Sequence, residues 1–308
     1  MRDDELIVRS IKRSELDAFS AFAAGQDRGF APQGSGSFRD WLLDLWRTKQ
    51  SAPGRCFVAC KPDEGAFLGA IVYWGPSNGP QHLEHIRISP RQGGRAVRLR
   101  LIRESVRLLG SNGFRTVYVL LLAPPLSIGR VRGWKIALTR LCFRLRTHGC
   151  RYEWRSNRGL PRPTGRLRFV TIKEAGDRAW RKADIRVRQG SLDPPDFTPL
   201  GSVLPHTAKW WRLAYDPDGS LVGLVQPGHN ESGATIEWIG VVPQRRGRGY
   251  VHELLAGGMA VLSAAGADTI RADTHIQNRA MQRALRLAGF DRIGERWWYE
   301  SAAAKRAR

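Results

Sequence analysis

The chain has few cysteines and no long hydrophobic segment. Its 308 residues include four cysteines, at positions 56, 60, 142 and 150, which show neither CxxC spacing nor a matching pair of histidines. This argues against a disulfide framework or a common zinc site, and predicts reduced thiols, no metal and a cytoplasmic location. There is no run of about 18 apolar residues, as a membrane span requires. Residues 1–5 (MRDDE) lack the hydrophobic core of a signal peptide, so we expect no membrane association.

Acidic residues are scarce in one block of the chain. Residues 86–168 contain 20 lysines and arginines against 2 acidic residues, a net charge of +18 out of +22 for the whole sequence. Such a block repels itself unless it faces solvent or a polyanion. Arginine-rich genomic composition is one explanation. The near absence of acids favours the other, a surface for tRNA or another polyanion, with Arg98, Arg103 and Arg107 as candidate contacts.

Residues 236–250 combine the features of a strand, a glycine loop and a helix start. Residues 236–242 are mostly β-branched and are followed by Pro243, which predicts a buried strand. Residues 244–249, Gln-Arg-Arg-Gly-Arg-Gly, lead into an apolar helical pattern over 251–265. Glycines let a ligand approach the backbone, and the free amides and dipole of a helix N-terminus attract negative charge. The stretch therefore predicts an anion-binding site.

Two motifs in this region resemble the GCN5-related N-acetyltransferase (GNAT) superfamily. Residues 244–249 fit its Gln/Arg-x-x-Gly-x-Gly/Ala signature. After a predicted strand over 268–274, Asn278-Arg279-Ala280-Met281 and Gly289-Phe290 resemble its Asn-x-x-Met/Ala…Gly-Phe helix. The resemblance implies an α/β (α+β) fold in which a mixed, mostly antiparallel sheet is flanked by helices. It also implies a loop that holds the pyrophosphate of coenzyme A.

The resemblance also assigns the donor site, which takes acetyl-CoA or another acyl-CoA. The residues that it places near the donor are Gln244, Arg245, Arg246, Gly247, Arg248, Gly249 and Asn278. A backbone amide at Val241 or Val242 would polarise the thioester carbonyl.

The GNAT plan implies direct attack of a neutral amine on the thioester, and the sequence has no Ser/Cys–His motif that would suggest a covalent intermediate. Glu237 is the first candidate for the general base, because burial would raise its pKa. An ordinary strand glutamate facing solvent is the alternative. Asp273 and His275, at the end of the next strand, are further candidates. Leu285 replaces the tyrosine that many family members use to protonate the departing thiolate, so the general acid is unassigned.

The same plan occurs about 150 residues earlier. A predicted strand over 83–89 and Pro90 precede Arg91-Gln92-Gly93-Gly94-Arg95-Ala96, which fits Arg-x-x-Gly-x-Ala. Helices are predicted over 97–109 and 132–146. We interpret this as an internal duplication. The first copy lacks the asparagine of the second motif, which indicates a degenerate, structural or substrate-binding copy, although a second active site is an alternative.

These patterns predict a degenerate GNAT-like domain over residues 1–155, with a basic face in 86–155. A linker with two glycines and two prolines follows over 156–166, and a catalytic GNAT domain occupies 167–308.

Three functions are compatible with this sequence. The first is an N-acyltransferase that moves an acyl group, acetyl in the simplest case, to a small-molecule amine, with Trp211 and Trp297 on predicted strands as candidate walls of the acceptor pocket. The second keeps the fold and takes an aminoacyl group from charged tRNA, bound by residues 86–168. The third is a non-enzymatic binding protein. Pocket shape decides the acceptor, and the sequence does not reveal it.

Overall fold

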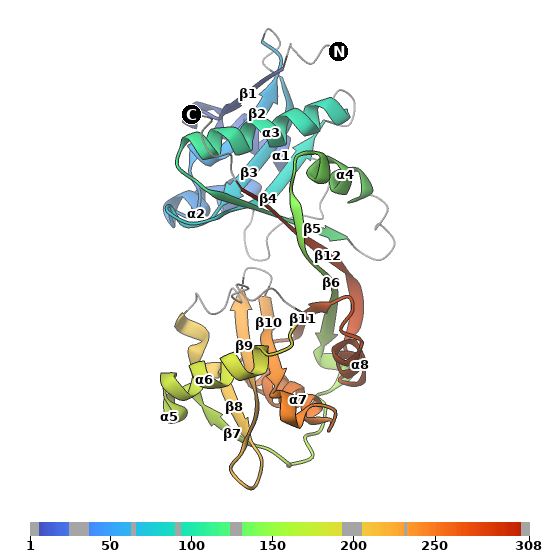
Figure 1. The fold of residues 1–308 in the computed structure, drawn as a ribbon. Helices are drawn as coiled ribbons and strands as arrows, with labels where there is room; N and C mark the ends of the chain where they lie inside the picture. The colour runs from blue at the N-terminus through green and yellow to red at the C-terminus, as the bar shows by residue number, and fades with distance from the viewer. Residues whose placement is uncertain are drawn as a thin grey trace. The chain divides into compact units, whose positions relative to one another are not determined.

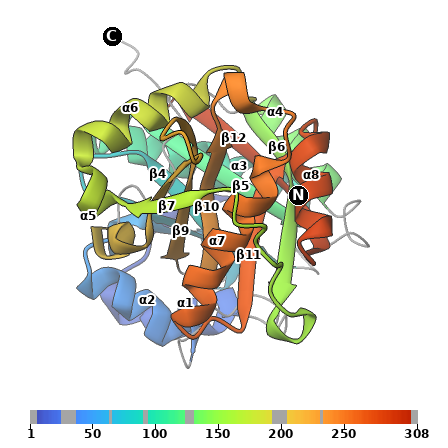
Figure 2. The ribbon, with the colours of Figure 1, turned by 90° about the horizontal axis from the view of Figure 1, so that it is seen from below.

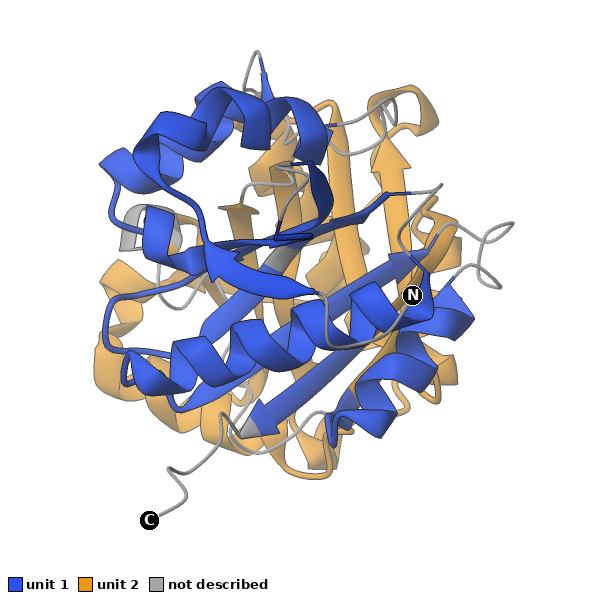
Figure 3. Cartoon of the chain, turned by 90° about the horizontal axis from the view of Figure 1, so that it is seen from above, with its two compact units in different colours: residues 1–146, 297–308 blue, residues 147–296 orange. Residues whose placement is uncertain are grey.

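The chain forms two compact units. The computed structural model describes residues 6–24, 37–62, 66–89, 94–123, 131–192, 205–230 and 233–302. Unit 1 contains residues 1–146 and 297–308, and unit 2 contains residues 147–296 (Figures 1 and 3).

Unit 1 is a sheet with the strand order β1-β2-β3-β4-β5-β12. The pairs β1–β2, β2–β3 and β3–β4 are antiparallel and β4–β5 is parallel. Its strands are β1 (Ile7–Ser10), β2 (Cys56–Cys60), β3 (Phe67–Trp74), β4 (Gln81–Ile88), β5 (Thr116–Ala123) and the end of β12 (Asp291–Ala302). Its helices are α1 (Leu16–Ala24), α2 (Phe38–Arg47), α3 (Arg95–Ser111) and α4 (Arg132–Arg140).

Helices cover both faces of this sheet. The apolar residues of α1 and α2 pack against one face, around Phe19 and Leu42, which are fully buried. Those of α3 and α4 pack against the other, around Leu101 and Leu138. Each helix thus buries one apolar stripe on the sheet. At the start of α2, the Ser37 side chain accepts a hydrogen bond from the Asp40 amide, which caps the helix.

Unit 2 is built on the same plan, with the strand order β6-β11-β10-β9-β8-β7. The pair β10–β11 is parallel and the other pairs are antiparallel. Its strands are β6 (Arg144–Arg155), β7 (Arg168–Thr171), β8 (Arg212–Tyr215), β9 (Leu221–Asn230), β10 (Gly233–Val241) and β11 (Thr269–His275). Its helices are α5 (Ile172–Ala175), α6 (Asp177–Arg188), α7 (Tyr250–Ala264) and α8 (Arg279–Leu287).

Two separate cores hold unit 2 together. Helices α7 and α8 pack on one sheet face, where Leu254 and Leu285 are buried (Figure 2). Helix α6 packs on the other face through Trp180 and Val187. The expected fold class, a mixed and mostly antiparallel sheet flanked by helices, is confirmed.

The order of elements repeats along the chain. One strand, two helices, three strands, a helix, a strand, a helix and a strand occur from β1 to β6 and again from β7 to β12. This supports the duplication inferred from the sequence. The expected division into 1–155, a linker over 156–166 and 167–308 differs from the observed units. Residues 147–166 belong to unit 2, because β6 pairs with β11, and residues 297–308 belong to unit 1.

Two local predictions are wrong. The helix expected over 132–146 ends at Arg140, and β6 starts at Arg144. The chain turns between them at Cys142, whose φ is +62°, and residues 149–155 of β6 pair with β11 as a strand. Trp211 lies before β8 rather than on a strand, since its amide closes a turn onto the Ala208 carbonyl. Residues 90–93, at the start of the first copy's glycine motif, lie outside the described residues.

None of the described helices is long and apolar enough to cross a membrane. The four cysteines are free thiols. Within the described residues, no cluster of histidine, cysteine and acidic side chains could hold a metal ion.

Candidate functional site

The glycine loop (residues 244–249) joins β10 to α7 and carries unpaired backbone amides. Gly247 and Gly249 both have a φ of +78°, a left-handed conformation that glycine adopts without strain. Among the described residues, none accepts a hydrogen bond from the amides of 247, 248 and 249. The amides of Tyr250 and Val251, the first two of α7, have no partner within the helix, whereas the His252 amide donates to the Gly249 carbonyl at 3.1 Å. Donors and helix dipole together favour an anion here.

Two arginines of the glycine loop hold it to the rest of unit 2. Arg245 forms an ion pair of 2.7 Å with Asp216, which is 4% exposed. Arg246 donates to the Val241 carbonyl at 3.0 Å and to the Gln189 carbonyl at 2.7 Å. Both side chains therefore fix the loop conformation, a role different from the donor contact inferred from the motif. Arg248 is exposed, and its carbonyl accepts a hydrogen bond from Arg166.

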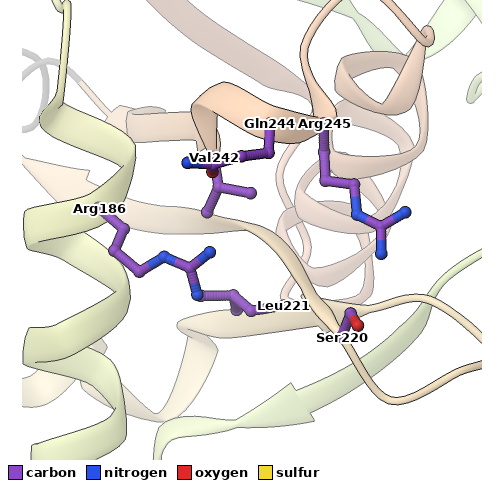
Figure 4. A pocket seen from close by; sticks show the side chains of 6 residues that line it. All are labelled: Arg186, Ser220, Leu221, Val242, Gln244 and Arg245. Atoms are coloured by element: carbon purple, nitrogen blue, oxygen red, sulfur yellow. The ribbon is translucent and has the colours of Figure 1, made fainter.

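A pocket of about 330 Å³ lies beside the glycine loop (Figure 4). It is lined by Arg186, Ser220, Leu221, Val242, Gln244 and Arg245. Arg186 extends from α6 toward Leu221, and Gln244 comes from the loop itself. The described residues provide no ion-pair or hydrogen-bond partner for the side chain of Arg186. The structure thus places Gln244 at this pocket. The sequence did not reveal the pocket itself, because its lining comes from separate segments.

Strands β10 and β11 pair over only three residues each. Residues 234–236 pair in parallel with 270–272, and β10 then continues to Val241. The Val242 amide donates to the Val222 carbonyl on β9 at 2.9 Å, so it is not free. The Val241 carbonyl instead accepts from Arg246, away from β9. Since the N–H and C=O of a strand residue point to the same side, the Val241 amide also points away from β9. Of the two candidate amides, Val241 has the suitable orientation.

Glu237 lies at a β-bulge of β10. Ile236 pairs with Pro227 and Trp238 pairs with Gln226, which leaves Glu237 as the extra residue. Both of its carboxylate oxygens are shielded from solvent and have no hydrogen-bond partner among the described residues. Burial raises the pKa of Glu237 to about 7. A buried acid without a partner is costly, and its titration near neutral pH suits a general base.

The other candidate bases have partners. Asp273 forms ion pairs with Arg151 and Arg296, both at 3.3 Å. His275 accepts a hydrogen bond from the Gln277 amide through Nδ1 at 3.2 Å, within the turn after β11. These contacts give both residues structural roles, whereas the Glu237 carboxylate has no such partner among the described residues.

Asn278 and Leu285 belong to helix α8. The Asn278 side chain accepts a hydrogen bond from the Met281 amide at 3.1 Å and so caps the helix. Leu285 is 1% exposed in the core beneath α7 and α8. The position at which a family tyrosine would supply a proton is therefore part of the hydrophobic core.

The two candidate tryptophans lie in hydrophobic cores. Trp211 stacks on Trp180 with a ring separation of 5.0 Å in unit 2. Trp297 is 1% exposed in the core of unit 1, on the face covered by α3 and α4. Both rings contribute to core packing.

The three candidate polyanion contacts lie on α3 and differ in environment. The Arg98 guanidinium lies 4.2 Å from the ring centre of Trp134, and burial lowers its pKa. Arg107 is exposed and pairs with Glu104 at 2.7 Å. Arg103 is also exposed and, four residues from Arg107, shares its side of the helix. A polyanion could thus reach two of the three side chains, while Arg98 is packed against the protein.

A known protein family matches the part of the chain that contains the candidate site. The profile of the acetyltransferase (GNAT) family matches residues 182–290, which include Glu237, the glycine loop and Asn278. No curated protein sequence matches the chain.

Solved structures extend the likeness to nearly the whole chain. A GCN5-related N-acetyltransferase from Sphaerobacter thermophilus is similar over 98% of this chain and 97% of its own, with a TM-score of 0.68 and 17% identity. A tandem GNAT protein from the clavulanic acid biosynthesis pathway is similar over 98% of this chain and 99% of its own, with a TM-score of 0.56 and 15% identity. The chain thus has the fold of tandem GNAT proteins, and its residues 182–290 carry the sequence pattern of the acetyltransferase (GNAT) family.

Proposed function

We propose that this protein is an N-acyltransferase that moves an acyl group, acetyl in the simplest case, from acyl-CoA to a primary amine, and that unit 2 is catalytic. The observation that carries the proposal is the buried carboxylate of Glu237, which has no hydrogen-bond partner in the described part of the chain, on the strand that leads into the glycine loop. A proton acceptor and an anion-binding helix start, joined by one strand, are the two parts that this chemistry needs.

The glycine loop would bind the donor. The unpaired amides of 247, 248 and 249 face no competing acceptor among the described residues, so they can donate to the pyrophosphate oxygens. Arg245 and Arg246 hold the loop in this conformation before the donor arrives, which lowers the entropic cost of binding. Arg248 adds an exposed positive charge.

Glu237 and Val241 would act on the reacting groups. The Glu237 carboxylate accepts a proton from the ammonium form of the acceptor, and the neutral amine then attacks the thioester carbonyl. The Val241 amide donates to the oxygen as negative charge develops on it. Collapse of the tetrahedral intermediate forms the amide, releases coenzyme A thiolate and leaves the amine's second proton to solvent. Leu285 supplies no acid, so the thiolate departs unassisted by that position.

A pair of matched variants tests the donor site. Gly247 and Gly266 lie near opposite ends of α7, both have positive φ, and an added Cβ at either would meet no atom within 4 Å. We expect Gly247→Glu to abolish acetyl-CoA binding in calorimetric titration, because it places a negative charge among the amides. Gly266→Glu carries comparable backbone strain and should bind normally. Equal affinity for both variants would refute the proposed donor site.

The charge of residues 86–168 supports a second candidate, in which the donor is aminoacyl-tRNA. The part of this block that lies in unit 1, residues 86–146, holds 14 lysines and arginines against one acidic residue, and with the exposure of Arg103 and Arg107 this favours a polyanion on unit 1. The double variant Arg103→Glu/Arg107→Glu should then weaken tRNA binding and reduce its salt dependence, with acetyl-CoA affinity unchanged. Micromolar acetyl-CoA binding with weak tRNA binding would rule this candidate out. Salt-sensitive tRNA binding without acetyl-CoA binding would support it.

A further inference from the structure

The bulge that carries Glu237 has a counterpart in unit 1. There, His85 pairs with Val72 and Leu83 pairs with Tyr73, which leaves Glu84 as the extra residue of β4. The parallel pairing stops at the equivalent place in both units, at Ile236 on β10 and at Leu83 on β4.

The sequences around the two bulges correspond as well. Ile-Glu-Trp-Ile at 236–239 aligns with Leu-Glu-His-Ile at 83–86. The prolines at 243 and 90 and the glycines at 247 and 94 follow at the same spacing. Each copy therefore carries a glutamate at the same position of the same bulge, so the glutamate alone does not distinguish the two copies.

The residue on the neighbouring strand does distinguish them. In unit 2, Thr235 pairs with Gly228, and in unit 1 the equivalent His82 pairs with Trp74. A Cβ added to Gly228 would lie 2.8 Å from Cγ of Glu237 and closer still to its carboxyl group. Gly228 is not among the residues with positive φ, so its backbone conformation does not require glycine. Steric room requires glycine instead, because the Glu237 side chain occupies the volume that a side chain at position 228 would fill.

In unit 1 this place is filled by a large ring. Trp74 stacks on His82 with a ring separation of 4.8 Å and an interplanar angle of 24°. His82 also contacts Tyr118 at 5.2 Å. The sheet position that holds a carboxylate over a glycine in unit 2 thus holds a cluster of aromatic rings in unit 1.

We propose that Gly228 is the residue that positions the general base, and that Trp74 closes the equivalent place in unit 1 and so confines catalysis to unit 2. The inference rests on the proposed function, since it concerns how Glu237 is held. Gly228 touches no substrate in this account, and acts only by leaving room for the carboxylate across β9.

The test is a mutant cycle between positions 228 and 237. Gly228→Ala displaces the carboxylate, so kcat should fall about 10- to 100-fold, a loss no larger than the rate contribution of a general base. The pH–rate profile should also lose its rise near pH 7. Acetyl-CoA affinity should be unchanged. In the Glu237→Gln background, Gly228→Ala should cause no further loss, because the base through which it acts is already absent.

Controls separate this inference from the proposed function. Gly54→Ala is a matched exchange at a site where an added Cβ meets nothing within 4 Å, and it should leave kcat unchanged. Glu84→Gln should also leave kcat unchanged. If Glu237→Gln lowers kcat but Gly228→Ala keeps the wild-type rate and pH profile, the positioning role is refuted and the general base stands. If Glu237→Gln itself has the wild-type rate, the proposed function fails. A loss of rate in Glu84→Gln would refute the confinement to unit 2.

Folding of the variants also tests the idea. If Gly228→Ala does not fold, the double variant Gly228→Ala/Glu237→Ala should fold, because it removes the side chain that competes for the space. Failure of the double variant as well would show that position 228 needs glycine for another reason, which overturns the inference.

Discussion

Replacing Glu237 by glutamine removes a buried charge and keeps the shape of the side chain, so its effect on stability can be calculated from the structure. Burial raises the pKa of Glu237 from 4.5 to about 7 in the folded protein. Each unit of pKa corresponds to about 1.4 kcal/mol, so the full effect is about 3 kcal/mol. The residue as a whole is only half-buried, and water reduces this to about 1–2 kcal/mol.

The sign follows from the direction of the shift. A pKa that is raised on folding contributes stability below the unfolded value of 4.5, and this contribution is lost as the pH rises through about 7. Glutamine does not titrate. The free energy of unfolding of Glu237→Gln, relative to wild type, should therefore increase by about 1–2 kcal/mol between pH 4.5 and pH 8.

Urea unfolding of both proteins at pH 4.5 and pH 8 measures this difference, because the other titrating groups are shared and cancel. The rate supplies an independent readout: wild-type kcat/KM should rise through pH 7, and this rise should be absent in the variant. A stability difference that is the same at both pH values would refute the claim that the carboxylate is desolvated. A wild-type rate in Glu237→Gln would refute its role as the base.

Three further variants test the supports of the site. Arg245→Ala leaves the buried Asp216 carboxylate without its ion pair, so chemical denaturation should show a loss of about 2–3 kcal/mol, and Asp216→Asn in the same chain should recover part of it. Arg246→Ala removes two hydrogen bonds to carbonyl groups that hold the glycine loop to α6. Calorimetry should therefore show acetyl-CoA affinity about 10-fold weaker. Unchanged affinity would mean that the loop is rigid without these bonds. Asn278→Ala removes the cap of α8 and should cost about 1 kcal/mol of stability with unchanged acetyl-CoA affinity; a weakened affinity would instead indicate donor contact.

Several parts of the site could be predicted from sequence because they depend on neighbours in the chain. Gly247 and Gly249 take left-handed conformations that few other residues adopt, so a glycine spacing before a helical pattern locates the loop. Glu237 is recognisable by its place on the strand before that loop. Asn278 precedes a helix, although the capping role was not separated from donor binding, since one side chain can serve either purpose.

The sequence contains a signal for Gly228 that does not by itself identify its role. Pro227 and Gly228 follow a mostly apolar segment, and both lie within β9. Proline and glycine inside a strand indicate a bulge or the close approach of another group. The sequence alone does not indicate which side chain makes that approach, because Glu237 comes from the paired strand.

The sequence by itself determined the strand–loop–helix order, the glycine loop and the repeat of one plan along the chain, since local backbone preferences and spacing specify these. Tertiary structure decided which arginines of the loop are held by Asp216 and by α6, and that Val241 rather than Val242 has a suitably oriented amide. It also decided that residues 147–155 of the first repeat belong to unit 2, and that residues 297–308 of the second repeat belong to unit 1. These outcomes depend on strand register and on partners distant in sequence. The proposed chemistry rests on the burial of Glu237 over Gly228, and this burial exists only once β9 and β10 have paired.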